Sequence, residues 1–271
     1  MDNITPRPDR QRAAEAFVRL LDIMDDLRQK CPWDREQTMD SIRTNTIEET
    51  YELSDAIMRK DMPDIRKELG DLMLHIVFYS KMADEQQQFD VADVLHGICD
   101  KLVFRHPHVY GQAAADSVGQ VLQNWEQLKL REKDGNRSVL GGVPSSLPAL
   151  IKATRIQEKA RGVGFDWEQR EQVWGKVREE LDELQAEFER GTPDSAELEL
   201  GDFMFAVVNA ARLYSINPET ALERTNQKFI KRFNYLEDKT IKQGRSLKDM
   251  TLAQMDEIWD EAKRLEREGK L

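Results

Sequence analysis

Cysteine, long apolar runs and excess positive charge are all scarce in this chain of 271 residues, and each absence excludes a class of protein. The two cysteines, Cys31 and Cys99, form no CxxC pair and no zinc-like spacing. We therefore expect reduced, packed thiols rather than a disulfide framework. The longest apolar stretches, residues 72–79 and 203–211, are far shorter than the roughly 20 residues that cross a bilayer. The first residues lack the basic start and apolar segment of a secretory signal, so a cytoplasmic protein without a membrane span is expected.

The charge balance of the chain is acidic. Lys and Arg number 40 and Asp and Glu number 51, which gives a net charge of −11. Proteins that bind nucleic acid or an anionic membrane need a basic surface that replaces counterions. The composition therefore argues against both partners and favours metal cations.

Apolar residues recur at helical spacing along nearly the whole chain, which predicts an all-α fold. Alternating runs rich in Val, Ile and Thr, which are typical of strands, are missing. Helix starts are indicated at Asp61, Thr192 and Asn217, because each is a capping residue with a proline within the next two positions. Gly191 marks a helix end.

One stretch near the middle of the chain has turn composition and no helical period. We expect a domain boundary there, with a first helical domain at 1–133, a linker at 134–147 and a second helical domain at 148–271.

The chain contains an internal repeat. Glu-Glu-Thr-Tyr-Glu-Leu at 48–53 is matched by Glu-Glu-Leu-Asp-Glu-Leu at 179–184, which sets a repeat register that aligns Glu48 with Glu179. In the same register, Glu-Leu-Gly-Asp at 68–71 falls on Glu-Leu-Gly-Asp at 199–202. Chance explains such a coincidence poorly, so the sequence predicts two tandem copies of one helical bundle unit.

Helical geometry brings these acids together in each copy. Glutamates three and four residues apart share one side of a helix, and the Glu-x-x-Asp pair repeats that spacing on a second, mostly apolar helix. An unpaired carboxylate is costly to bury, so such a pair needs a cation or a proton. Oxygen-only ligands suit Mg²⁺ or Mn²⁺, and all four histidines lie in the first copy, so zinc or a histidine base is not part of the shared chemistry. A solvated acidic helix face is the alternative interpretation.

A basic element follows each group of acids. Lys228 and Arg232 lie four residues apart on one helix face, and Lys101 and Arg105 are their counterparts in the first copy. A lysine point charge beside a planar arginine fork suits a polyphosphate. An exposed basic face is the alternative.

The combined pattern, Glu-Glu-x-x-Glu followed after fifteen residues by Glu-x-x-Asp, resembles the MazG family of nucleoside triphosphate pyrophosphohydrolases. The similarity extends over essentially the whole chain and includes Cys-Pro-Trp-Asp at 31–34, Arg-His-Pro-His-Val-Tyr at 105–110 and Val-Gly-Phe-Asp-Trp at 163–167. It implies an all-α protein, assembled as a homodimer, that uses Mg²⁺ to split a nucleoside triphosphate into the monophosphate and pyrophosphate. Such an enzyme removes unwanted nucleotides from the pool.

The resemblance also implies roles for single residues. Glu179, and Glu48 in the first copy, fit the residue that orients or deprotonates the attacking water. The implied metal ligands are Glu180, Glu183, Glu199 and Asp202 in the second copy and Glu49, Glu52, Glu68 and Asp71 in the first. The implied nucleotide-binding residues are Lys176, Lys228, Arg232, Trp259 and Lys263, with Asn209 as a further candidate.

The two copies are not equal. Asn209 stands opposite Phe78 in the repeat, and Trp259 and Lys263 have no clear counterpart in the first copy. We therefore expect the second copy to carry most of the turnover. Trp259 also fits the apolar stripe of its own helix, where it would be plain core.

Two other classes of protein remain as alternatives. A carboxylate-bridged di-iron or di-manganese bundle would need Glu-x-x-His pairs, but neither Glu68 nor Glu199 is followed by histidine at the third position. A dimeric helical scaffold, or a sensor that binds nucleotide without turnover, is the non-enzymatic alternative. Pyrophosphate release by the purified protein would exclude it.

Overall fold

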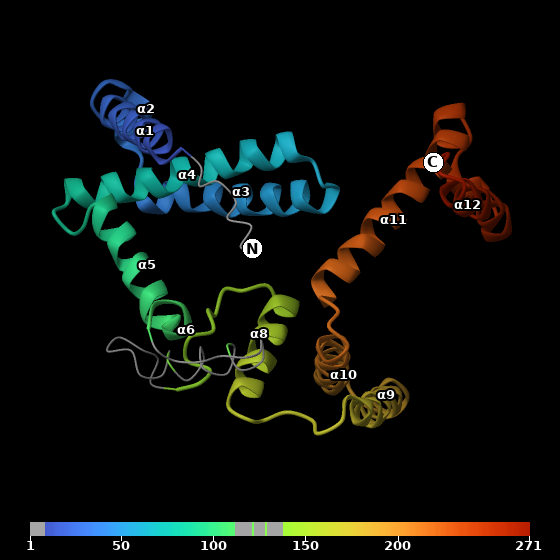
Figure 1. Ribbon diagram of the computed structural model, residues 1–271. Helices are drawn as coiled ribbons and strands as arrows, with labels where there is room; N and C mark the ends of the chain where they lie inside the picture. The colour runs from blue at the N-terminus through green and yellow to red at the C-terminus, as the bar shows by residue number, and fades with distance from the viewer. Residues whose placement is uncertain (1–8, 112–120, 122–127, 129–137) are drawn as a thin grey trace, which may run out of the picture. The chain divides into compact units, whose positions relative to one another are not determined.

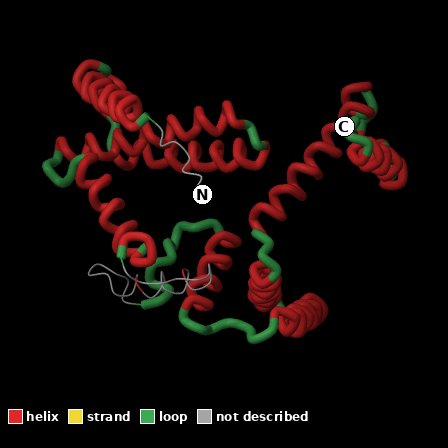
Figure 2. Tube along the Cα trace, in the orientation of Figure 1, coloured by secondary structure: helices red, strands yellow, loops and turns green. Residues whose placement is uncertain are grey.

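The computed structural model describes residues 9–111, 121, 128 and 138–271, and within these residues every regular element is a helix. Figures 1 and 2 show the helices and the loops that join them. The expected all-α fold is confirmed. The chain divides into two compact units, residues 1–114 and 115–271. Part of the linker expected at 134–147, residues 134–137, lies outside the described residues, and its boundaries stay a prediction.

The first unit is built around two neighbouring helices, α3 and α4, with α1 packed against α4. Its core contains Met24, Ile42, Val77, Phe78 and Met82, and a side chain of this size contributes about 1.5–3 kcal/mol when it is fully buried. The helices are α1 (Arg10–Lys30), α2 (Pro32–Glu36), α3 (Met39–Arg59), α4 (Met62–Glu85), α5 (Val91–Arg105) and α6 (Pro107–Tyr110).

The second unit repeats the paired arrangement with α9 and α10, and α8 packs against α10. Val173, Val177, Ala206 and Ala210 are buried between the two helices. The elements are α8 (Ala149–Gly162), η1 (Arg170–Gln172), α9 (Val173–Arg190), α10 (Pro193–Leu213), α11 (Pro218–Lys239), η2 (Ile241–Gln243), η3 (Leu247–Asp249) and α12 (Leu252–Arg267).

The helix ends follow the capping residues that the sequence contains. The side chains of Asp61, Thr192 and Asn217 each accept a hydrogen bond from a backbone N–H in the first turn of α4, α10 and α11. Gly191 follows the last residue of α9. Because these caps fix where α4 and α10 begin, they also fix the position along each helix at which its acids face the acids of the neighbouring helix.

An apolar stripe remains exposed at equivalent positions of both units. On α4 it consists of Leu69, Met73 and Ile76, and on α10 of their counterparts in the repeat, Leu200, Met204 and Val207. Residues four and three apart lie on one helix face, so each stripe is continuous.

Neither cysteine forms a disulfide. Cys31 is half-buried, whereas Cys99 is exposed on α5, so the expected packing role is wrong for Cys99 in this chain. Among the described helices, none combines the length and apolar character that a membrane span requires.

Candidate active site

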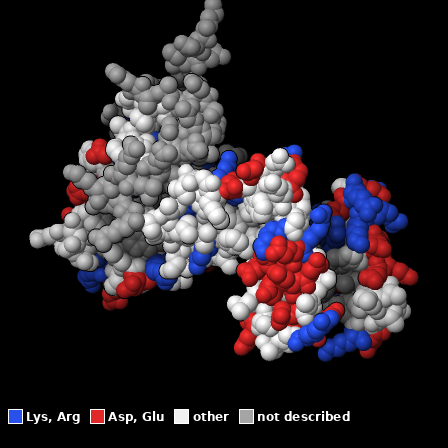
Figure 3. Space-filling view, turned by 90° about the horizontal axis from the view of Figure 1, so that it is seen from below, with Lys and Arg blue, Asp and Glu red and all other residues white. Residues whose placement is uncertain are grey.

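The acids of the second unit converge between α9 and α10. Carboxylate oxygens of Glu179, Glu180 and Glu183 lie within 4.8 Å of one another, and oxygens of Glu180, Glu199 and Asp202 do the same. Glu180, only 6% exposed, belongs to both groups and is their centre. On the face of the second unit in Figure 3, acidic side chains gather into a patch flanked by Lys and Arg.

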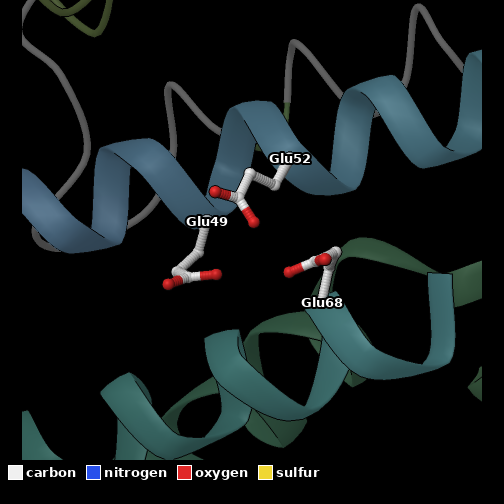
Figure 4. A group of neighbouring side chains, drawn as sticks. All are labelled: Glu49, Glu52 and Glu68. Atoms are coloured by element: carbon white, nitrogen blue, oxygen red, sulfur yellow. The ribbon is translucent and has the colours of Figure 1, made fainter. Parts of the chain in front are cut away.

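The first unit holds a smaller version of the same cluster. Oxygens of Glu49 and Glu52, from α3, lie within 4.8 Å of an oxygen of Glu68 on α4. Figure 4 shows the three carboxylates directed toward the same space between the helices. Asp71 is not within this group, although its charge acts on Glu49. The repeat therefore places acids of both helices together in each unit.

These carboxylates repel one another in the absence of a cation. Burial and the charges of Glu183, Asp202 and Glu180 raise the pKa of Glu199. Burial and the neighbouring acids likewise raise the pKa of Glu49 in the first unit. A multivalent cation would remove this repulsion, and a set made only of carboxylate oxygens fits Mg²⁺ or Mn²⁺.

A lysine partly neutralises each cluster, but it comes from a different helix in each unit. In the second unit, Lys176 Nζ on α9 lies 2.6 Å from Glu180 and 2.8 Å from Glu179, and these carboxylates raise the pKa of Lys176. In the first unit, Lys67 Nζ on α4 lies 2.7 Å from Glu68, and this contact lowers the pKa of Glu68 despite its burial.

The repeat shows that the two lysines are not counterparts. Lys176 is matched by Asn45 in the first copy, and Lys67 is matched by Leu198 in the second. Both copies thus retain the acids and differ in the residue that neutralises them.

A pocket of about 700 Å³ adjoins the acids of the second unit. The part of its lining next to the acid cluster includes Lys176, Glu180 and Asp202. The aromatic side chains that line it are Phe165, Trp167 and Phe205. Most of its lining is apolar, as is usual for pockets that take small organic ligands.

A charged pair stiffens one wall of this pocket. The guanidinium of Arg212 binds both carboxylate oxygens of Asp166, and it also donates to Asn209 Oδ1 at 2.7 and 3.1 Å. Burial opposes ionisation of Asp166, but the hydrogen bonds from Arg212 and from the Trp167 N–H hold the pKa of Asp166 below its usual value. Arg212 thereby orients the side chain of Asn209, which lines the pocket.

Comparison with known proteins identifies the family. The model of the MazG nucleotide pyrophosphohydrolase domain matches the chain twice, at residues 37–110 and 169–236. The chain belongs to the MazG family. It is 44% identical over 255 residues to the nucleoside triphosphate pyrophosphohydrolase of Escherichia coli (strain K12), a match that covers 92% of this chain and 97% of that protein. It is 40% identical over 256 residues to the nucleoside triphosphate pyrophosphohydrolase/pyrophosphatase MazG of Thermotoga maritima, covering 93% of this chain and 98% of that protein.

Each MazG match contains one acid cluster and its paired helices, which confirms the family and the tandem arrangement expected from the repeat. A further relative comes from Bacillus subtilis, where the protein named YabN is 41% identical over 239 residues, 88% of this chain and 49% of that protein.

The remaining residues expected to bind nucleotide form a separate group on α11 and α12. Arg232 Nη2 lies 2.6 Å from Glu266, and Lys263 Nζ lies 2.8 Å from Asp260. The Trp259 ring centroid lies 5.0 Å from that of Phe229. Lys228 is exposed on α11. None of these four expected residues lines the pocket beside the MazG acids, so their role in binding nucleotide stays a prediction.

Four of the seven expected site residues on α9 and α10 line the pocket, whereas Glu179, Glu183 and Glu199 do not. Lys176, Glu180, Asp202 and Asn209 all line the pocket. The sequence interpretation missed the aromatic and amide side chains opposite them, namely Gln157, Phe165, Trp167 and Phe205. The only signal was the Val-Gly-Phe-Asp-Trp segment, which had contributed to the MazG resemblance without a site role.

Proposed function

We propose that this protein hydrolyses nucleoside triphosphates to the monophosphate and pyrophosphate, with Mg²⁺ held by the acids of α9 and α10. The observation that carries the proposal is the convergence of Glu180, Glu183, Glu199 and Asp202 beside a pocket of nucleotide size. The names of two nearly full-length relatives, both nucleoside triphosphate pyrophosphohydrolases, support it.

The residues present fit a divalent cation. The donors are all carboxylate oxygens, and they come from the paired helices α9 and α10. Burial, together with the charges of Glu183, Asp202 and Glu180, raises the pKa of Glu199, and a cation would relieve the repulsion between these charges. When bound, Mg²⁺ supplies positive charge that acidifies water and stabilises the leaving pyrophosphate. Mn²⁺, with similar ligand preferences, would substitute.

Glu179 is the residue we assign to the attacking water. It is exposed at the edge of the cluster, one position before the buried Glu180, and its carboxylate can orient a water and take its proton. Lys176 now contacts both glutamates. Once a cation neutralises them, Lys176 can turn to the substrate's phosphates.

We place most of the turnover in the second copy. Its cluster has acids of both helices around Glu180 and opens on the large pocket. The first copy, with Glu49, Glu52 and Glu68, retains a cation site that contributes less to hydrolysis. Hydrolysis of this kind would remove unwanted nucleotides from the pool.

We further propose that the protein is a homodimer. The exposed stripes on α4 and α10 are apolar, continuous and present in both units. Contiguous apolar surface of this kind marks a protein interface, because leaving it in water is unfavourable. Pairing with a second copy of the chain would cover the stripes.

The deciding experiment is Mg²⁺-dependent pyrophosphate release from the eight common ribo- and deoxynucleoside triphosphates. The wild type is compared with Glu180→Gln and with Glu189→Gln, a matched change on an exposed part of the same helix. We expect release that Glu180→Gln abolishes and Glu189→Gln retains. No release from any nucleotide, with the cation still bound, would favour a sensor or scaffold instead. Hydrolysis in ¹⁸O-water tests the position of attack, and label found only in pyrophosphate would exclude the α-phosphorus.

A further inference from the structure

The pocket of the second unit contains a buried acceptor without a partner. Gln157, on α8, is 6% exposed and lines the pocket. Its Nε2 donates a hydrogen bond to the backbone oxygen of Phe205 at 2.9 Å. A carbonyl oxygen can only accept, so this bond fixes the orientation of the amide and leaves Oε1 as the free acceptor. Within the described structure, Gln157 Oε1 has no hydrogen-bond partner.

Aromatic side chains stand in the same pocket. Phe165 is 82% exposed, although a ring of that size is usually covered. It is placed there by the end of α8, where Gly164 has a φ of +92° and the Phe165 N–H donates to the Ala160 oxygen at 3.0 Å. Gly is suited to this left-handed backbone. Trp167, two residues further, also lines the pocket.

The first unit lacks the small side chains that keep this space open. Asn209 and Ala206 line the pocket, and their counterparts in the repeat are Phe78 and His75. Phe78 is 3% exposed and His75 is 8% exposed, and Phe78 belongs to the core of that unit. The space is therefore a feature of the second unit and not of the helical pair in general.

We propose that this pocket binds the nucleobase of the substrate, with Phe165 and Trp167 against the base and Gln157 Oε1 accepting a hydrogen bond from an N–H donor on its edge. The inference rests on the proposed function, because the acids beside the pocket then hold the triphosphate. A planar, mostly apolar group with a polar edge matches aromatic walls and one buried acceptor. Every standard base carries an amino or imino donor, so a single acceptor holds any of them and rejects a base without one.

The test compares ATP with purine riboside triphosphate, which has the same ring system but no amino group and no other edge donor. We expect wild-type kcat/KM to favour ATP by about tenfold or more, because a buried acceptor stays unpaired with the analogue. In Gln157→Met, which keeps the length of the side chain and removes the acceptor, the ratio falls to about one. A purely structural role for Gln157 would lower both rates by the same factor and leave the ratio unchanged. Equal rates in the wild type would overturn the proposal.

Equilibrium binding separates this inference from the hydrolase itself. Calorimetric titration of the same two nucleotides requires no turnover. An ATP preference that Gln157→Met removes, in a protein that releases no pyrophosphate, would refute the hydrolase and support the pocket. Pyrophosphate release from both nucleotides, with equal affinities, would support the hydrolase and refute the pocket.

Discussion

The pair formed by Asp166 and Arg212 should be a large local contribution to the stability of the second unit. The Arg212 side chain is 7% exposed and that of Asp166 is 20% exposed, so both charges lie mostly out of water. Removing one partner of a buried pair costs about 3–5 kcal/mol, because the other charge stays buried. In Asp166→Asn, Arg212 still donates to Asn209, so we expect a loss of about 2–3 kcal/mol, at or just below the lower end of that range.

The effect should depend on pH in a defined direction. The folded-state pKa of Asp166 is lowered, so its carboxylate contributes stability that is complete above the unfolded pKa, about 3.9. That contribution is lost as the pH falls through the lower, folded-state pKa. The difference in unfolding free energy between wild type and Asp166→Asn should therefore be full at pH 7 and shrink below about pH 4.

Urea denaturation of the full chain, followed by tryptophan fluorescence between pH 7 and pH 2, measures this difference. Asp256→Asn, a change at an exposed position of α12, is the matched control and should stay within about 0.5 kcal/mol of wild type. An Asp166→Asn variant that is as stable as this control at pH 7, or whose difference from wild type grows as the pH falls, would refute the reasoning.

Three further outcomes are expected. Glu183→Gln should lower kcat for pyrophosphate release by about 100-fold or more, which is the scale of a lost charge-stabilising group. The decrease in kcat caused by Glu52→Gln should be several-fold smaller. Equal decreases would contradict the assignment of most of the turnover to the second copy. Lys176→Met should bind Mg²⁺ more tightly, because no ammonium competes for Glu180, and calorimetric titration with Mg²⁺ measures this affinity. The same variant should have a lower kcat/KM for ATP, which steady-state kinetics measures. Met204→Glu and Met73→Glu, each tested by light scattering, should yield monomers, and a dimer that survives both changes would exclude the apolar stripes as the interface.

The acid clusters could be predicted because their information is local. Glu180 and Glu183 are three residues apart, and helical geometry alone puts them on one side of α9. The apolar residues around Glu199 predicted a largely buried helix, which is confirmed for Val208 but wrong for Leu200, Met204 and Val207, since these three are exposed. The repeat indicated that the two segments belong together. In the structure, the pairing of α9 with α10 brings oxygens of Glu199 and Asp202 within 4.8 Å of Glu180, which lies equally close to Glu183 on its own helix.

The pocket could not be predicted in the same way, because its wall comes from positions far apart in the chain. Gln157 lies on α8 and its partner Phe205 on α10, 48 residues later. A single glutamine on a helix carries no spacing signal, and its free acceptor appears only when the tertiary contact is known. The phosphate clamp expected from the spacing of Lys228 and Arg232 stays a prediction, and in the structure Arg232 pairs with Glu266 of α12.

The two copies differ in how much stability they gain from packing at the position of the pocket. In the first unit, Phe78 fills the core, and burying a phenylalanine contributes about 1.5–3 kcal/mol. In the second unit, the equivalent Asn209 contributes little apolar burial, and Gln157 Oε1 stays unpaired. Both features reduce the stability of that unit, and a ligand that used them would offset this cost. If the proposed function holds, a cation would stabilise the acid cluster of either unit, whereas a substrate would use the open space beside the acids in the second unit alone.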